Sequence, residues 1–279
     1  DTNTVIVDTL PIAAWSLIED TICDGESAYF TDNSIPTSAT IDQWFWQFGD
    51  GNTSTQQNPT HLYTSPGTYT VTLQVTDTND CVHSVTDTVI IRPNPIASFI
   101  SNDTCVGFNT ILISTSIPDS VNYPNIYGTI NSWDWTFGDG NSYGNNLSTV
   151  QHAYGTHGTY NGTLIVTDQY GCSTSWSDSI NVSPGPIAGF SADTVCVGDP
   201  TTFTDTSTVV PPLGVGIETW FWQFGDGNTS ADPNPTHTYA DAGIYNAILT
   251  VTDSNGCQGY DTNTVIVDTL PIAAWSLIE

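Results

Sequence analysis

One short pattern of aromatic residues, glycine and aspartate occurs three times in this chain of 279 residues. The segment WFWQFGDGNTS begins at Trp44, WDWTFGDGNSY begins at Trp133, and WFWQFGDGNTS returns at Trp220. The copies start 89 and 87 residues apart, which is the size of one small domain. An internal period of this kind indicates tandem copies of one folding unit.

The segments around this pattern alternate between apolar and polar side chains. In TYTVTLQVTD, residues 68–77, every second side chain from Tyr69 to Val75 is apolar, and the side chains between them are polar. The WFWQF segment alternates in the same way before a Gly-Asp-Gly turn, where Gly51 supplies backbone freedom. No segment has a helical period, so the predicted class is all-β, with sandwiches of two antiparallel sheets about the size of an immunoglobulin domain.

The first nineteen residues are identical to the last nineteen, so the sequence has a longer period of 260 residues. Alignment on the internal repeat places the closing strand of one unit in residues 1–8, and the opening strand of another unit in residues 269–279. The three domains between them are expected at residues 9–93, 94–184 and 185–268. Two origins of the overlap stay open, namely covalent continuation of the array and exchange of a strand between chains.

Six cysteines occupy matched positions, two in each copy. An even count without a Cys-x-x-Cys motif or a histidine cluster predicts disulfides in an oxidising compartment and argues against zinc sites. One disulfide is expected inside each domain. The expected pairs are Cys23–Cys81, Cys105–Cys172 and Cys196–Cys257.

The charge of the chain excludes several partners. Twenty-nine acidic residues stand against a single base, Arg92, for a formal net charge of −28. Nucleic acid and anionic membrane surfaces attract proteins through lysine and arginine, which are nearly absent here, so neither is an expected partner. No apolar run is long enough to cross a membrane, so no membrane insertion is expected in this segment.

The combined motifs resemble a known family. The order W-x-F-G-D-G, N-P-T-H-x-Y, G-x-Y and V-x-L-x-V-T-D is similar to the PKD domain, and the resemblance covers nearly the whole chain. The paired cysteines, with the CVGDPTTFTDTS segment at Cys196, resemble PKD repeats of large secreted Bacteroidota-type proteins. The resemblance implies an immunoglobulin-like sandwich. The second copy departs most, because it has VQHAY for NPTHxY and an insertion from Val121, so its lateral loops are expected to be specialised.

Polar residues of the repeat invite catalytic interpretations, but structural ones are favoured. An aspartate between two glycines after a strand most often accepts backbone hydrogen bonds in the turn, and the PKD resemblance implies the same role. A histidine two residues before a tyrosine in each copy is expected to be packed and hydrogen-bonded. Catalysis would need three identical active sites on a sandwich without a cleft, so no enzyme is expected. The aspartates are Asp50, Asp139 and Asp226, and the histidines are His61, His152 and His237.

Calcium is the one metal that the sequence suggests. Aspartates recur before each first cysteine and at the end of each long alternating segment, and carboxylates are ligands that calcium prefers. No EF-hand spacing is present, and diffuse condensation of cations on an anionic surface is the alternative. No cofactor is required. The candidate calcium ligands are Asp20, Asp77, Asp103, Asp168, Asp193 and Asp253.

Two phenylalanines are expected to point away from the core. Because Trp44, Trp46 and Phe48 share one face, Phe45 should face outward, as should Phe221 in the third copy, where the second copy has Asp134. An outward phenylalanine has three alternative explanations: cover by the same domain, lateral contact between domains or chains, and a sugar-binding platform. Glycans are possible partners at the Asn-x-Ser/Thr sites Asn52, Asn102, Asn146, Asn161, Asn181 and Asn228.

These observations predict a structural protein, secreted to the extracellular space or the cell surface. Its tandem domains would form a stalk or filament that associates with further copies of itself. An adhesin or carbohydrate-binding array is one alternative. An accessory spacer region of a secreted hydrolase is another.

Overall fold

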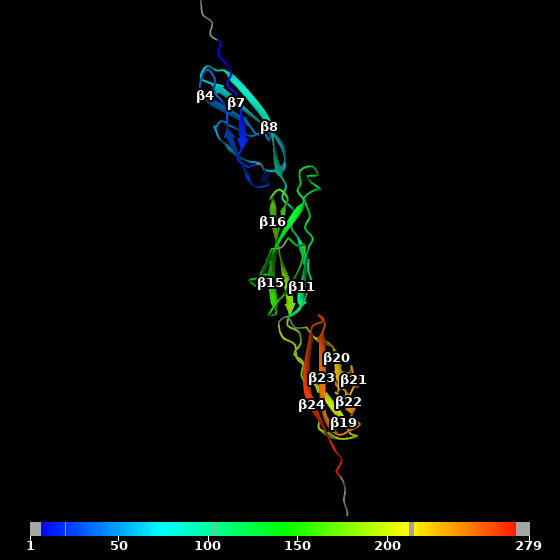
Figure 1. The fold of residues 1–279 in the computed structure, drawn as a ribbon. Helices are drawn as coiled ribbons and strands as arrows, with labels where there is room; N and C mark the ends of the chain where they lie inside the picture. The colour runs from blue at the N-terminus through cyan, green and yellow to red at the C-terminus, as the bar shows by residue number, and fades with distance from the viewer. Residues whose placement is uncertain (1–6, 20, 103, 145, 212–214, 272–279) are drawn as a thin grey trace, which may run out of the picture.

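The computed structural model of the chain describes residues 7–19, 21–102, 104–144, 146–211 and 215–271. Its secondary structure in these residues is entirely β, as predicted, with no helix. Figure 1 shows three domains arranged in a row, with the ends of the described chain at opposite ends of the row. No part of the described chain forms an apolar helix of the length that crosses a membrane.

Each domain is a sandwich of a three-stranded and a five-stranded sheet. In the first domain, the smaller sheet has the order β1-β3-β6 and the larger has the order β2-β8-β7-β4-β5. The strands of this domain are β1 (Trp15–Leu17), β2 (Ile22–Cys23), β3 (Ser27–Asp32), β4 (Ile41–Gln47), β5 (Thr53–Ser54), β6 (Thr60–Leu62), β7 (Gly67–Asp77) and β8 (Val82–Arg92).

The other two domains repeat this topology strand for strand. The second contains β9 (Phe99–Ser101), β10 (Thr104–Cys105), β11 (Asn109–Ser114), β12 (Ile130–Thr136), β13 (Ser142–Gly144), β14 (Thr149–Ala153), β15 (Gly158–Asp168) and β16 (Ser173–Ser183). The third contains β17 (Phe190–Ala192), β18 (Val195–Cys196), β19 (Pro200–Asp205), β20 (Ile217–Gln223), β21 (Thr229–Ser230), β22 (Thr236–Thr238), β23 (Gly243–Asp253) and β24 (Gln258–Asp268).

One strand pair in each domain differs from the prediction of wholly antiparallel sheets. The short strand that carries the first cysteine runs parallel to the end of the last strand, so Cys23 lies opposite Arg92. The equivalent pairs are Cys105 with Ser183 and Cys196 with Asp268. The first cysteine of each domain therefore lies beside the end of the last strand, at the end of the domain where the chain leaves it.

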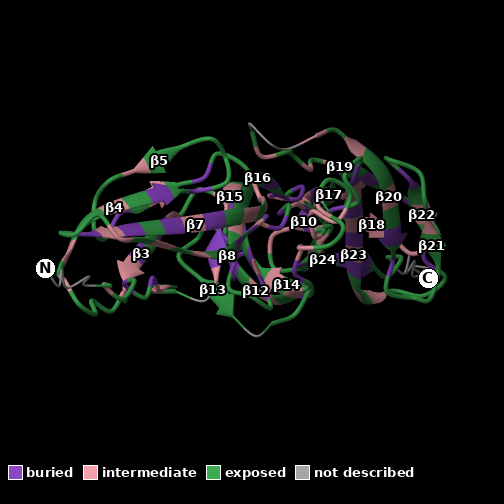
Figure 2. Ribbon diagram, turned by 90° about the horizontal axis from the view of Figure 1, so that it is seen from above, coloured by how far each residue is buried: buried purple, intermediate pink, exposed green. Residues whose placement is uncertain are grey.

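The faces of the strands match the predicted alternation. Val71, Leu73 and Val75 of β7 are fully buried, while the side chains between them are partly or fully exposed. Figure 2 shows this alternation of buried and exposed residues along β7. The predicted pieces of strand in residues 1–8 and 269–279 lie mostly outside the described residues, and the described parts form no strand.

A buried tryptophan stands at the centre of each core. Trp46, Trp135 and Trp222 are at most 1% exposed, and their neighbours are the buried apolar residues of both sheets. A buried indole N–H needs an acceptor. Each indole donates to a backbone carbonyl of the following loop, at Gln56 (2.9 Å), Leu147 (3.0 Å) and Asp232 (2.8 Å). The tryptophan thus ties the loop after the Gly-Asp-Gly turn to the core.

The two glycines of each Gly-Asp-Gly turn have different requirements. Gly138 has a φ of +80°, and a Cβ placed there would lie 2.7 Å from the backbone oxygen of Asn161 in β15. Gly140 has a φ of +93°, but a Cβ there would meet no atom within 4 Å. Gly138 therefore supplies both a left-handed conformation and close approach to the neighbouring strand, whereas Gly140 supplies only the conformation.

This difference predicts the relative cost of two alanine substitutions. Gly140→Ala should lower the free energy of unfolding of the second domain by about 1 kcal/mol, the usual penalty for a left-handed alanine. Gly138→Ala should cost more, because β15 must also move. Hydrogen exchange of amides in the second domain under native conditions measures both values. Equal costs would contradict the role assigned to the close approach.

Candidate functional site at the domain junctions

The two disulfides among the described residues join consecutive domains, not the two sheets of one domain. Cys23 of the first domain is bonded to Cys172 of the second, and Cys105 of the second is bonded to Cys257 of the third. The Cα atoms of the bonded pairs are 5.5 and 5.6 Å apart. Cys81 and Cys196 form no disulfide. The cysteines do form disulfides, as predicted, but the predicted pairs are wrong, namely Cys23–Cys81, Cys105–Cys172 and Cys196–Cys257.

The length of the last strand explains this correction. The first cysteine of a domain lies beside the end of that strand, and the second cysteine immediately precedes its start. The strand β8 has eleven residues, so it separates Cys23 from Cys81 by about 35 Å, because an extended strand rises about 3.3 Å per residue. A disulfide needs Cα atoms within about 7 Å of each other. The alternating segment after each second cysteine was the sequence signal that could have excluded the predicted pairs.

A second contact repeats at every junction. It joins the end of the last strand of one domain to the residue two positions before the second cysteine of the next. Between the first two domains, the Arg92 guanidinium lies 3.4 Å from the centre of the Tyr170 ring. Between the second and third, Asn255 Nδ2 donates to Ser183 Oγ over 2.9 Å. The disulfide and this contact therefore recur side by side.

The same contact occurs once more at the start of the first domain. Asn79 Nδ2 donates to Asp8 Oδ2 over 2.9 Å. Asp8 occupies the repeat position of Asp268, because residues 1–19 and 261–279 are identical. Asp8 therefore stands where the strand end of a preceding domain would stand, and it contacts the first domain as Ser183 contacts the third.

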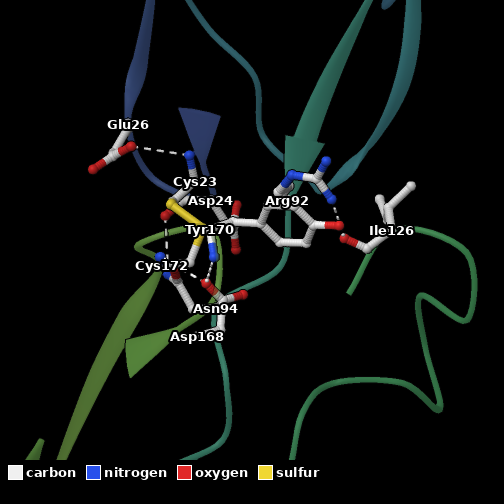
Figure 3. Close-up of a disulfide and its surroundings, with 9 residues drawn as sticks. All are labelled: Cys23, Asp24, Glu26, Arg92, Asn94, Ile126, Asp168, Tyr170 and Cys172. Carbon is white, nitrogen blue, oxygen red and sulfur yellow. Dashed lines mark hydrogen bonds between the residues drawn. A yellow bond between two sulfur atoms is a disulfide. The ribbon is translucent and has the colours of Figure 1, made fainter. Parts of the chain in front are cut away.

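Arg92 has a role at the junction that sequence reasoning missed. As well as stacking on Tyr170, it donates from Nη1 to the Ile126 carbonyl over 3.1 Å (Figure 3). Ile126 lies in the insertion of the second copy, so this specialised loop contacts the preceding domain. The only lysine or arginine in the chain is thus placed where two domains meet.

The linker residues contact the domains on both sides. Asn94 Nδ2 donates to the Asp24 carbonyl of the preceding domain over 3.0 Å. Gly185 holds the matching position at the next junction, with a φ of +73°, and a Cβ there would lie 3.6 Å from Cys257 Cβ. The short linkers are therefore packed against the domains, at Asn94 against the preceding domain and at Gly185 against the following one.

In each domain, one buried aspartate holds the second cysteine in place. Asp168 Oδ1 accepts from the backbone N–H groups of Tyr170 and Cys172, each over 2.9 Å. Asp77 and Asp253 make the same pair of bonds in their domains. These aspartates are at most 3% exposed, and the Oδ2 atom of each has no hydrogen-bond partner. Through these hydrogen bonds, the aspartates fix the turn that carries the second cysteine.

The calcium ligands suggested by the sequence do not come together in the described chain. Asp20 and Asp103 lie outside the described residues, and Asp193 is exposed. Among the described residues, no group of three or more histidine, cysteine, aspartate or glutamate side chains is placed to hold a metal ion. Calcium binding therefore stays a prediction.

In every domain, the aspartate of the Gly-Asp-Gly turn forms a pair with the histidine that lies two residues before the tyrosine. In the second domain, His152 Nε2 lies 2.7 Å from Asp139 Oδ2, and the imidazole stacks on Phe137 with ring centres 4.1 Å apart. Asp139 also accepts from the backbone N–H and the amide of Asn141. Structural roles for the aspartate and the histidine are thereby confirmed. The equivalent pairs are Asp50–His61 and Asp226–His237.

These hydrogen bonds affect the ionisation of the aspartates. Partial burial opposes the charged form of Asp139, but hydrogen bonds from His152 and Asn141 outweigh burial and lower its pKa to about 2. Hydrogen bonds from the equivalent asparagine and histidine likewise outweigh burial and lower the pKa values of Asp50 and Asp226. The turns therefore favour the ionised carboxylate at neutral pH.

Phe45 and Phe221 face outward as expected, with exposed fractions of 38% and 48%. Asp134, at the same position of the second domain, is also exposed. The described residues leave both phenylalanines partly exposed, so lateral contact through them stays a prediction.

Comparison with known proteins agrees with the architecture. The profile of the family described as PKD domain matches residues 8–92, 120–184 and 181–267, more than half of the chain. A microbial collagenase of Vibrio alginolyticus is 47% identical over 68 residues, which cover 24% of this chain and 8% of the collagenase. The pre-pro-metalloprotease PrtV of Vibrio cholerae is 29% identical over 136 residues, which cover 48% of this chain and 14% of PrtV.

Collagenase ColA of Bacillus cereus is 33% identical over 92 residues, which cover 33% of this chain and 10% of ColA. The matches thus span a small part of each of these relatives. Among solved structures, the PKD1 domain of Vibrio cholerae PrtV is 31% identical, and the match covers 30% of this chain and 98% of that domain, with a TM-score of 0.27. Relatives from Vibrio and Bacillus give no support to the Bacteroidota origin suggested by the sequence.

The contact between Arg92 and Tyr170 predicts different behaviour of the two disulfides. Arg92→Ala removes a cation–π contact and a charged hydrogen bond at the first junction only, so Cys23–Cys172 should be reduced by dithiothreitol roughly 3- to 10-fold faster. Cys105–Cys257 serves as the internal control and should react at an unchanged rate. Mass spectrometry of alkylated peptides follows both bonds. A parallel change at both junctions, or no change, would contradict a local role for Arg92.

The lowered pKa of Asp139 predicts a loss of stability in acid. A carboxyl group with a folded pKa of about 2 stabilises the fold above its ordinary pKa of 3.8, and this contribution disappears as the pH falls from 3.8 towards 2. Asp139→Asn should therefore be less stable than the native chain at pH 5, and the difference should shrink towards pH 2. Hydrogen exchange of second-domain amides measures the difference, which would be independent of pH if the carboxylate had no such role.

Proposed function

Because the chain belongs to the PKD-domain family and disulfides join its successive domains, we propose that it is a stiff structural segment of an extracellular stalk or filament. The matched regions of the enzyme relatives are PKD domains, which are non-catalytic modules with an immunoglobulin-like fold. A catalytic role for this segment is therefore not proposed. The observation that carries the proposal is the position of the disulfides across the junctions.

A disulfide between domains acts differently from one inside a domain. It does not join the sheets of one sandwich, but it limits how far two sandwiches can rotate or separate. Each junction also has a packed linker and a contact beside the cysteines, so three connections lie close together. Without a large hydrophobic interface, domains of one chain are expected to move relative to one another. The covalent bond supports the stiffness that a stalk requires.

The disulfides also support an extracellular location. Structural disulfides persist in oxidising compartments and are rare in the reducing cytosol. The family relatives named as collagenases and a metalloprotease are in keeping with this location. We further propose that the array associates with other copies of itself, and that dissolved cations offset the repulsion expected from a net charge of −28.

A second function is supported by the relatives. Because this chain matches 8 to 14% of the length of proteins named as collagenases and a metalloprotease, it could instead be an accessory spacer of a secreted hydrolase. A stiff spacer and a stiff stalk have the same mechanical property. They differ in what the array carries, which the flanking sequence would reveal.

Small-angle X-ray scattering tests the mechanical part of the proposal. The oxidised chain should scatter as an extended, rigid rod of three domains. A variant with Cys23→Ser, Cys105→Ser, Cys172→Ser and Cys257→Ser should keep its domains but show a smaller radius of gyration and a broader distance distribution. Circular dichroism checks that the domains remain folded. Identical scattering from both proteins would contradict a stiffening role for the disulfides.

A further inference from the structure

The two cysteines that form no disulfide occupy the two repeat positions that are bonded to each other at the junctions. Cys81 occupies the repeat position of Cys172 and Cys257, both of which are bonded to the preceding domain. Cys196 occupies the repeat position of Cys23 and Cys105, both of which are bonded to the following domain. By its repeat position, Cys81 would bond to a domain before the first, and Cys196 would bond to a domain after the third.

The surroundings of Cys196 match those of the bonded first cysteines. Cys196 lies opposite Asp268 in a parallel strand pair, as Cys23 lies opposite Arg92. The next residue, Val197, donates its backbone N–H to the Asp268 carbonyl over 2.8 Å, and the equivalent bond at the first junction is also 2.8 Å long. The backbone that presents the thiol to a following domain is thus already formed.

The surroundings of Cys81 match those of the bonded second cysteines. Asp77 Oδ1 accepts from the Cys81 backbone N–H over 2.9 Å, as Asp168 accepts from Cys172. Asn79 already binds Asp8, the residue that holds the repeat position of Asp268. The first domain therefore contacts the strand end of a preceding unit, and Cys81 lies two residues from this contact.

We propose that Cys196 forms a disulfide with the Cys81 of the next copy of the 260-residue block in the same chain, so that every junction of the array is covalently closed. Residues 261–279 repeat residues 1–19 and so begin that next copy. The repeat of Cys81 would stand 145 residues after Cys196, close to the separations of 149 and 152 residues in the two disulfides. The inference rests on the proposed function only in taking the chain as part of a repeating array.

The bond forms by thiol–disulfide exchange with a small disulfide oxidant, RSSR. One cysteine thiolate attacks RSSR and releases one RS⁻, and the second thiolate attacks the mixed disulfide and releases another. Two Cys–SH groups and one RSSR thus give one Cys–S–S–Cys bond and two RSH. The two electrons removed from the cysteines reduce the oxidant.

A chain lengthened by one further copy of residues 20–279 tests the inference. After refolding with oxidised and reduced glutathione, this chain should contain two free thiols under denaturing conditions, the first Cys81 and the last Cys196. Peptide mapping should find Cys196 joined to the second copy of Cys81. Four free thiols, or disulfide-linked oligomers in place of monomers, would overturn the proposal.

Two substitutions in the first copy of the lengthened chain serve as matched controls. Cys196→Ser should raise the count from two thiols to three, because it frees the second copy of Cys81. Cys81→Ser should lower the count from two to one, because that cysteine has no partner in this chain. The same count after both substitutions would also overturn the proposal. Thiol counts do not depend on stiffness, so this test can fail while the scattering test succeeds.

Discussion

The eleven-residue strands of the β7–β8 hairpin, and their counterparts β15–β16 and β23–β24, are the constraint on which the rest of the structure depends. Each hairpin supplies buried side chains to its core and runs along the whole domain. Its turn carries the second cysteine at one end, and its last residue lies beside the first cysteine at the other. The two cysteines at opposite ends of this hairpin cannot bond to each other, and in the structure two cysteines of each junction bond across it instead.

The junctions combine a covalent bond with weak polar contacts. Twenty-nine acidic residues and one basic residue leave few opportunities for ion pairs between domains, and the ion pairs in the described residues join histidine and aspartate within one domain. Loops of 149 and 152 residues closed by a disulfide correspond to about 5 kcal/mol each in the chain-entropy model. In a chain of like charges, a bond that is insensitive to salt holds domains together more reliably than surface charges would.

Many features of each domain follow from local patterns in the sequence. Alternation identified the strands and their buried faces, and Phe45 was placed outward because its neighbours Trp44 and Trp46 point inward. The Gly-Asp-Gly turn and the histidine beside it were predicted correctly, because their partners lie within about a dozen residues. The parallel pairing of Cys23 with Arg92 was missed, because it joins segments at the two ends of a domain.

The sequence by itself determined that this chain forms three repeated β-sandwiches with cysteines at matched positions, since period and alternation are properties of the chain order. Only the tertiary structure decided which cysteines meet. Pairing depends on which end of a domain each cysteine occupies and on how the next domain is placed. Two cysteines per repeat are compatible both with bonds inside a domain and with bonds between domains, so their number could not decide the pairing. The contact of Arg92 with Tyr170 has the same origin, because its two residues lie in different domains and are 78 positions apart.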